Sequence, residues 1–424
     1  MLYTLLLLLL FRLGCYITVT MVNIASLNDT MSSNSNSVTG MINMISGGAF
    51  SRLSIFAMSI TPYITASIVI QLMSMVIPAL ERLTKEGGEE GRKKIDRYTK
   101  LVSLALAIVE SLGLYFSFKT SGLFVSDGLL TGFVVVLSLV SGTSLLMWLG
   151  DKITSKGVGN GISMLIFAGI VSGIPSALVS IFSLINKDGK FSTIGLVTAI
   201  LIVLAVLLLV VGVIFVQLAE RRIPVQYSKK VVGRKMMGAQ NTHIPIKPAM
   251  ASVMPIIFAS SFMTFPAMVI ELFVHDIENK SGLIRFIYNF SIATSSSTVG
   301  WQYTIINAII YLLLIIGFTY FYTYATFNPA EIANNIKQNG GFIPGIRAGK
   351  PTADYLSSVL SKVVLFGGIF LAAIAILPMF AKATGLNTAF GGSSILIVVG
   401  VAIELSQQLQ SLIVMKHYKG FLEK

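Results

Sequence analysis

The feature that most constrains the fold is a series of long apolar runs, each about as long as the 20 residues that an α-helix needs to cross a bilayer. Only 12% of the 424 residues are charged, against about 25% in soluble domains. The chain is therefore predicted to be an all-α polytopic membrane protein. We place ten transmembrane helices at about 2–22, 59–78, 99–118, 129–149, 160–184, 193–216, 251–272, 301–321, 358–378 and 393–413.

The first run has the length of a signal peptide, but no basic region precedes it and no small-residue cleavage site comes before Asn23. We therefore expect it to be a retained span. Ten spans divide into an N-terminal half, 1–184, and a C-terminal half, 193–413, followed by a tail, 414–424. A duplicated unit of five spans comes out inverted, as in many transport proteins, so we predict two inverted five-helix halves.

Basic residues are distributed very unequally between the loops. Of the 31 Lys and Arg residues, 23 lie in alternate loops and the tail, 7 lie in the other loops, and Arg12 lies inside the first run. The positive-inside rule places the basic loops and both termini in the cytoplasm. Anionic lipid is one partner that such loops attract.

The stretch 47–73 combines a glycine-led segment with an apolar run. In that run Ile60, Ile64 and Ile68 are spaced four residues apart, so they share one helical face. One interpretation is an ordinary span after an ordinary loop. The other is a short helix that re-enters the membrane over an apolar constriction, which is tolerated only where protein or a water-filled cavity surrounds it.

The segment before this run has the features of a hinged, displaceable helix. Gly47 and Gly48 accept backbone angles that other residues resist, which suits a hinge. Phe50, Leu53 and Phe56 follow at intervals of three and would form an apolar stripe. Arg52 lies off that stripe and is expected to face water.

Two long basic loops have patterns of their own. Residues 217–250 alternate positive charges with Val, Ile and Tyr, which predicts a β-hairpin that projects from the membrane. Residues 322–357 carry a helix-start signal at Asn328 and a turn-rich tip at Arg347. Such loops serve membrane retention and lipid attraction, or they dock a cytosolic partner, and two structured loops together favour docking.

Catalytic patterns are missing from the chain. The spans hold four scattered ionisable residues, Arg12, Glu110, Glu271 and Glu404, which form no relay and are mostly expected to be structural. No metalloprotease motif and no phosphate-binding P-loop occurs. The glycine-rich stretch 157–161 follows a span rather than a strand, and we interpret it as a flexible lead-in to the fifth span.

The lone Cys15 excludes an internal disulfide and a cysteine-based zinc site. We therefore expect no enzyme, no metal and no cofactor. A secondary transporter and an intramembrane hydrolase remain as alternatives to a passive protein-conducting channel. The scarcity of charge in the spans weighs against the transporter, and the lack of a nucleophile paired with a base weighs against the hydrolase.

Four long stretches resemble the SecY/Sec61-alpha family, whose members are the channel subunits of protein translocase. They read GGAFSRLSIFAMSITPYITASIVIQLM (47–73), ERRIPVQYSKKVVGRKMMGAQNTHIPIKPAM (220–250), FNPAEIANNIKQNGGFIPGIRAGKPTADYL (327–356) and ILIVVGVAIELSQQLQSLIVMKHYKGFL (395–422). The resemblance covers essentially the whole chain. It departs at the start, which lacks the family's basic amphipathic segment, and at 28–40, where a Ser/Asn-rich stretch replaces the usual loop.

The resemblance implies an hourglass of ten helices that opens laterally between the second and third spans on one side and the seventh and eighth on the other. It implies a re-entrant plug helix at about 41–57, with Gly47, Gly48, Phe50, Arg52, Leu53 and Phe56. The implied pore ring consists of Ile60, Ile64, Ile166, Ile170, Ile257 and Ile397. The implied docking residues are Arg221, Arg222, Lys229, Lys230, Arg234 and Arg347.

The resemblance also implies a function and its partners. A channel of this family passes unfolded secretory polypeptides across the bacterial plasma membrane and releases signal sequences and transmembrane segments into lipid. Its partners would be the small membrane subunits SecE and SecG, and the SecA motor ATPase or the ribosome on the cytoplasmic face. Signal peptides and unfolded polypeptides would be the substrates.

Overall fold

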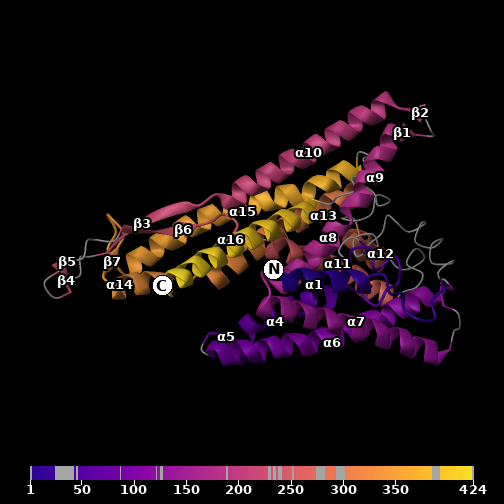
Figure 1. Cartoon of the computed structure of the whole chain (residues 1–424), viewed down its shortest axis with the longest axis horizontal. Helices are drawn as coiled ribbons and strands as arrows, with labels where there is room; N and C mark the ends of the chain where they lie inside the picture. The colour runs from indigo at the N-terminus through magenta and orange to yellow at the C-terminus, as the bar shows by residue number, and fades with distance from the viewer. Residues whose placement is uncertain are drawn as a thin grey trace.

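The structure is a computed structural model, and it describes residues 2–23, 43, 46–85, 87–120, 122–124, 128–187, 190–227, 231–232, 235–236, 241–250, 253–273, 282–292, 301–383 and 392–422. This part of the chain is built mainly of long helices that run roughly side by side (Figure 1). The first half contains α1 (Leu2–Gly14), α4 (Thr61–Val76), α5 (Pro78–Lys85), α6 (Gly88–Thr120), α7 (Leu129–Lys156), α8 (Gly161–Ser172) and α9 (Ile174–Ile185).

The second half begins with α10 (Thr193–Leu218) and α11 (Met254–Phe273). It continues with α12 (Gly282–Ile292), α13 (Trp301–Thr326), α14 (Pro329–Gln338), α15 (Lys350–Ala383) and α16 (Gly392–Leu422). All ten predicted runs coincide with these helices, wholly or in part. The exceptions to a simple match are α12 and α14, which are additional short helices outside the runs, and the first run, where the helix ends at Gly14.

Seven helices among the described residues are long and apolar enough to cross a membrane, and the bent pair α4–α5 makes eight. The bend between α4 and α5 is 104°, because Ile77 is extended and Pro78 restarts the helix. Two further apolar helices are shorter, Leu2–Gly14 and Met254–Pro266. The predicted fifth span is broken at Gly173, two residues before a proline that lacks a backbone N–H.

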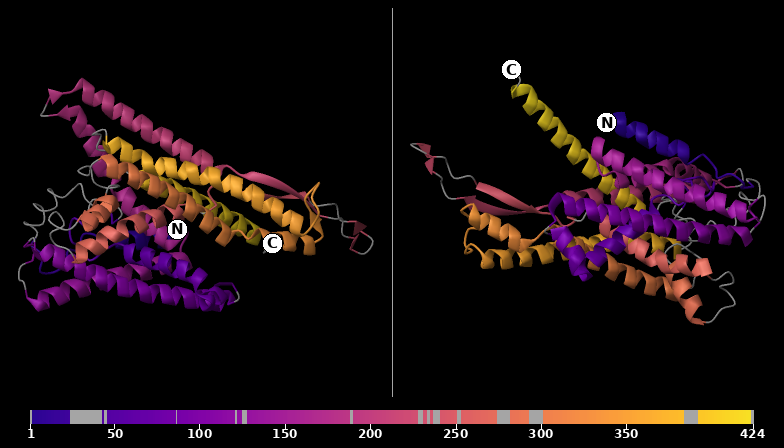
Figure 2. Two further views of the ribbon diagram at one scale, coloured as in Figure 1. Left: turned by 180° about the vertical axis from the view of Figure 1, so that it is seen from behind. Right: turned by 90° about the horizontal axis from the view of Figure 1, so that it is seen from below.

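The helices pack into two groups that meet at two seams. In the first group α1 lies against α7 and α8, and α6 lies against α4 and α7; in the second, α13 packs on α15 and α10 packs on α16. One seam joins α8 to α16, and the other joins α11 to α4 and α6. The last helix, α16, continues beyond its neighbours toward the C-terminus (Figure 2, right).

A small sheet projects from one end of the helices, on the left in Figure 1. Strands β3 (Arg221–Tyr227) and β6 (Asn241–Ile246) form an antiparallel pair, so the hairpin predicted in 217–250 is confirmed. Beyond it lies the two-residue pair β4 (Val231–Val232) and β5 (Lys235–Met236). At the other end of the helices, β1 (Asn186–Lys187) pairs with β2 (Lys190–Phe191).

A strand from the second basic loop completes this sheet. β7 (Gly341–Phe342) pairs with β3, so the strand order is β6-β3-β7. Side chains of β3, β6, α14 and α15 share one hydrophobic cluster, which includes Ile223, Val225, Ile336 and Leu360. The two basic loops are therefore one packed unit at the end of the bundle where α5 also lies (Figure 1).

Candidate functional site

The isoleucine row of α4 is the starting point of the site. Helix α4 begins at Thr61, with Ile60 at the N-cap position and Pro62 in the first turn, where its missing N–H is not needed. Ile60, Ile64 and Ile68 are 1%, 8% and 6% exposed and lie in one hydrophobic cluster. The prediction that they share a buried face is confirmed.

Three other helices bring isoleucines to the same cluster. Ile166 and Ile170 come from α8, Ile397 comes from α16, and Ile257 of α11 packs against them. All six residues predicted for the pore ring are thus collected from four helices that are far apart in the sequence. Since α8 and α16 belong to different halves, the ring lies where the two halves meet.

A cavity of about 20 Å³ lies among Ile166, Ile257 and Ile397. Ser163 and Glu404 contribute polar groups to its lining. A buried water needs about 10–15 Å³ and two or more polar partners, so this space holds about one water molecule. An apolar constriction of this size is closed to a hydrated ion.

The plug segment, defined as residues 41–57, is described at residue 43 and from residue 46 onward. From 46 to 60 the chain makes consecutive turns instead of the expected regular helix. Gly47 and Gly48 have φ angles of 65° and 84°, and Leu53 and Ser59 also have positive φ angles, of 41° and 52°. A right-handed helix cannot continue through such residues, which explains the difference.

The turns also separate the three residues of the predicted apolar stripe. Phe56 lies in the cluster that contains the isoleucines, where its ring stacks on Phe11 at 6.0 Å. Phe50 and Leu53 lie in a second cluster, and Phe50 contacts Phe118 of α6 with the ring centres 5.9 Å apart. The expectation that all three rest against the isoleucine ring was wrong for Phe50 and Leu53.

The start of the plug segment lies close to α8. A Cβ atom on Gly47 would come within 2.8 Å of the Ser172 hydroxyl and 3.0 Å of the Gly169 Cα. Glycine is therefore needed here both for space and for its positive φ angle. Gly169 adjoins Ile170, so this contact places the plug segment beside the isoleucine cluster.

The second seam between the halves contains one long-range polar contact. The Gln71 amide of α4 lies 3.5 Å from the Tyr322 hydroxyl of α13, at the outer limit of a hydrogen bond. The remaining contacts of α11 with α4 and α6 hold together the helices that correspond to the second, third and seventh predicted spans. This seam is the place where the resemblance implies a lateral opening.

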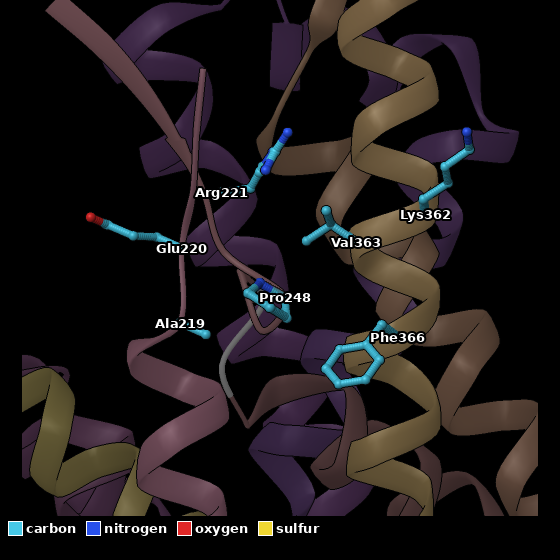
Figure 3. Close-up of a pocket in the computed structure, with 7 residues that line it drawn as sticks. All are labelled: Ala219, Glu220, Arg221, Pro248, Lys362, Val363 and Phe366. Atoms are coloured by element: carbon cyan, nitrogen blue, oxygen red, sulfur yellow. The ribbon is translucent and has the colours of Figure 1, made fainter. Parts of the chain in front are cut away.

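Basic residues gather at the end of the bundle that carries the sheet. Arg221 and Lys362 line an open cavity of about 310 Å³ with Val363 and Phe366 (Figure 3). The neighbouring Glu220 points away from Lys362 (Figure 3). It accepts a hydrogen bond of 2.5 Å from Arg222, which holds the pKa of Glu220 below its ordinary value.

Arg347 lies at an exposed turn between β7 and α15, as the sequence predicted. Gly345 and Gly349 flank it with φ angles of 83° and 103°, and the Thr352 hydroxyl donates a 2.8 Å hydrogen bond to its carbonyl oxygen. Asn328 caps α14, as expected from the start signal. The three predicted docking residues Lys229, Lys230 and Arg234 lie outside the described residues.

The glycine-rich stretch 157–161 is a defined turn. Its N–H groups are already used: Val158 donates to Thr4 at 3.1 Å and Gly161 donates to Thr154 at 2.8 Å. A Cβ atom on Gly161 would lie 1.9 Å from the Gly150 carbonyl oxygen, so glycine allows α7 and α8 to approach closely. The stretch is thus an interhelical contact with no N–H groups left for a phosphate.

The ionisable residues inside the spans are spread over different helices. Glu110 of α6 is buried, and one of its carboxylate oxygens has no hydrogen-bond partner among the described residues. Glu404 of α16 lines the small cavity at the ring. Glu271 falls at the end of α11. Within the described part of the chain, His, Cys, Asp and Glu residues form no group of three that could bind a metal.

Sequence reasoning missed the residues of the first helix that touch the plug segment. Arg12 hydrogen-bonds to the Gly47 carbonyl oxygen, and the ring of Tyr16 lies beside both Arg12 and Arg52. A charge inside a span is a signal for function by itself. Nothing in the spacing, however, indicates that Arg12 faces a segment 35 residues away.

Comparison with known proteins places these features in a family. The SecY family model matches residues 54–406. "Protein translocase subunit SecY" of Halalkalibacterium halodurans is 43% identical over 99% of this chain and 96% of its own length.

Two solved structures share the fold at low identity. One is described as "The plug domain of the SecY protein stablizes the closed state of the translocation channel and maintains a membrane seal" (TM-score 0.67, 18% identity, 96% and 91% of the two chains). The other is Sec61 in the canine ribosome-channel complex from the endoplasmic reticulum (TM-score 0.64, 17% identity, 96% and 91%).

Proposed function

The chain belongs to the SecY family of protein translocase subunits, and from this premise we propose how its own residues conduct a polypeptide. It is a translocase channel in a membrane rather than an enzyme. Unfolded secretory polypeptides pass through the ring formed by Ile60, Ile64, Ile166, Ile170, Ile257 and Ile397. The plug segment covers that ring at rest and leaves it when a polypeptide arrives.

One observation carries this proposal: six isoleucines from four helices form one cluster, and the space among them holds about one water molecule. Aliphatic side chains offer no specific hydrogen bond, so the ring does not select among the varied side chains of a passing polypeptide. The same side chains keep water out when the channel is empty, because an apolar constriction closes by dewetting.

Lateral release of signal sequences and transmembrane segments is assigned to the seam between α4 and α6 on one side and α11 and α13 on the other. The contact between Gln71 and Tyr322 is long, which supports a seam held mainly by apolar packing. An apolar signal helix can replace such packing without leaving buried polar groups unsatisfied. The exchange is therefore inexpensive for the channel.

The cytoplasmic face is assigned to the end with the sheet, so that both termini lie inside the cell and the membrane is the bacterial plasma membrane. Arg221, Arg222 and Arg347, together with Lys229, Lys230 and Arg234, would dock the SecA motor ATPase or the ribosome. Support comes from the shared core of the two loops, which holds these basic residues in one rigid unit. Anionic lipid is the partner for the remaining basic residues.

The small membrane subunits SecE and SecG are proposed to cover part of the outer helical surface. Helix α10 supports this, because many of its apolar side chains are exposed, among them Leu207, Leu208 and Val211 at 57–65%. In a membrane, such a surface faces either lipid or another transmembrane helix.

The experiment is reconstitution of the purified channel complex in vesicles. The proposal predicts that a precursor with a signal sequence becomes protease-protected only when the motor and ATP are present. Small solutes are not taken up under the same conditions. Uptake of a solute without the motor, or motor-independent entry of the precursor, would contradict the proposal.

A further inference from the structure

The first helix makes a hydrogen bond to the start of the plug segment. The Arg12 guanidinium donates through one nitrogen to the Gly47 carbonyl oxygen and through the other to the Tyr16 hydroxyl at 3.2 Å. A hydrogen bond from a charged donor is about twice as strong as a neutral one. Arg12 is half-buried, which shields this bond from competing water.

Tyr16 adds a second contact between the same two parts of the chain. The Arg52 guanidinium of the plug segment lies 4.1 Å from the centre of the Tyr16 ring, and the Arg12 guanidinium lies 5.0 Å from it. Both distances are within the range of cation–π attraction. One aromatic ring thus contacts an arginine from the first helix and an arginine from the plug segment.

The main chain ties the two segments together as well. The Val19 N–H donates to the Leu53 carbonyl at 2.9 Å, and the Ile55 N–H donates to the Ile17 carbonyl at 3.0 Å. These bonds flank Thr18 and Ser54, which therefore form a non-hydrogen-bonded antiparallel pair. In addition, the Cys15 thiol lies 3.8 Å from the Ser46 carbonyl oxygen.

Arg12 is placed where it controls the contact between the plug segment and α8. The carbonyl that it binds belongs to Gly47, the residue with the close approach to Gly169 beside the isoleucine cluster. We propose that Arg12 is a positioning residue that latches the plug segment to the first helix in the closed channel, and that opening separates residues 53–55 from 17–19. This inference rests on the proposed function.

The first test replaces Arg12 in the reconstituted channel complex. Arg12→Met should raise resting ion conductance, and translocation of a precursor with a defective signal sequence, by about tenfold, as expected from the loss of one charge-assisted hydrogen bond. Arg12→Lys should give an intermediate value, because one ammonium cannot reproduce the planar fork that binds two acceptors. Leu13→Met, on the exposed side of the same helix turn, is the control.

The second test locks the two segments together. Thr18→Cys and Ser54→Cys, in a Cys15→Ala background, place two thiols at an antiparallel pair whose spacing suits a disulfide. Oxidation should stop motor-driven translocation while resting conductance stays at the wild-type level, and reduction should restore transport. The reduced variant and each single cysteine variant, both treated with oxidant, are the controls.

The outcomes separate the latch from the channel function. If the wild-type complex moves the precursor and the oxidised double-cysteine variant moves it equally well, the segments do not separate and the latch is wrong. Arg12 variants as tight and as selective as wild type would overturn it independently. If the wild-type complex itself fails to move the precursor with motor and ATP present, the proposed function is wrong.

Discussion

The ring of Phe56 in the plug segment occupies the space beside Gly14 at the end of the first helix. A Cβ atom on Gly14 would lie 2.0 Å from the nearest ring atom of Phe56. Phe56 also stacks on Phe11 and lies in the isoleucine cluster. The first helix therefore shapes the pocket in which the innermost part of the plug segment is held.

Replacing Gly14 with alanine should displace Phe56 and weaken the seal. Overpacking a tight core costs roughly 1–3 kcal/mol, which is enough to shift the closed population about tenfold or more. We expect higher resting conductance of Gly14→Ala in planar bilayers. Gly317→Ala is the matched control, because that helical glycine has open space around it. Wild-type conductance in both variants would contradict the packing of Phe56 on Gly14.

The double substitution Ile64→Asn and Ile397→Asn should let the constriction hold water. Both side chains are buried, at 8% and 7% exposure, and a buried amide without partners costs roughly 1–3 kcal/mol until water enters. We expect a steady resting ion current in single-channel recordings. Ile64→Val with Ile397→Val keeps the ring apolar and should remain closed. A tight Asn variant would show that these residues do not form the seal.

Phe50 should hold the plug segment on α6 rather than on the ring. Its burial contributes roughly 1.5–3 kcal/mol and its contact with Phe118 about 0.5–1.5 kcal/mol more. Phe50→Asn should leak transiently and accept precursors with defective signal sequences, whereas Phe50→Leu should stay close to wild type. An ion-tight Phe50→Asn channel with normal selectivity for signal sequences would make the segment an ordinary loop.

Reversing the charge of Arg347 should block transport without affecting folding. The side chain is exposed, and only its carbonyl oxygen takes part in the local turn. Arg347→Glu should therefore insert and accumulate normally but lose motor-driven translocation. Lys93→Glu, an exposed charge reversal on α6, is the control, since its surface ion pair with Glu89 contributes little. Loss of the protein from the membrane would indicate a structural role for Arg347.

Local patterns predicted the parts of the site that depend on local structure. The spacing of Ile60, Ile64 and Ile68 predicted one buried face, and alternation in 217–250 predicted the β3–β6 hairpin. Asn328 indicated the start of α14 because capping needs only the next turn of chain. The positions of the remaining ring residues came from the family resemblance.

Contacts between distant segments were beyond the sequence. The stripe of Phe50, Leu53 and Phe56 was drawn on a helix, but positive φ angles at Gly47 and Leu53 turn the chain and divide the stripe between two clusters. The hydrogen bond from Arg12 to Gly47 joins residues 35 positions apart, and no periodicity encodes it. The pairing of β7 with β3 is non-local in the same way.

Site-specific photocrosslinking of a stalled precursor tests the central claim most directly. A photoreactive amino acid is placed at Ile64, at Ile397 or at the exposed Leu207 of α10 in the wild-type complex, and the precursor is stopped midway by a folded C-terminal domain. The account predicts crosslinks to the precursor from positions 64 and 397 and none from 207. A precursor that is stalled and protease-protected but never crosslinks to the two ring positions would contradict it.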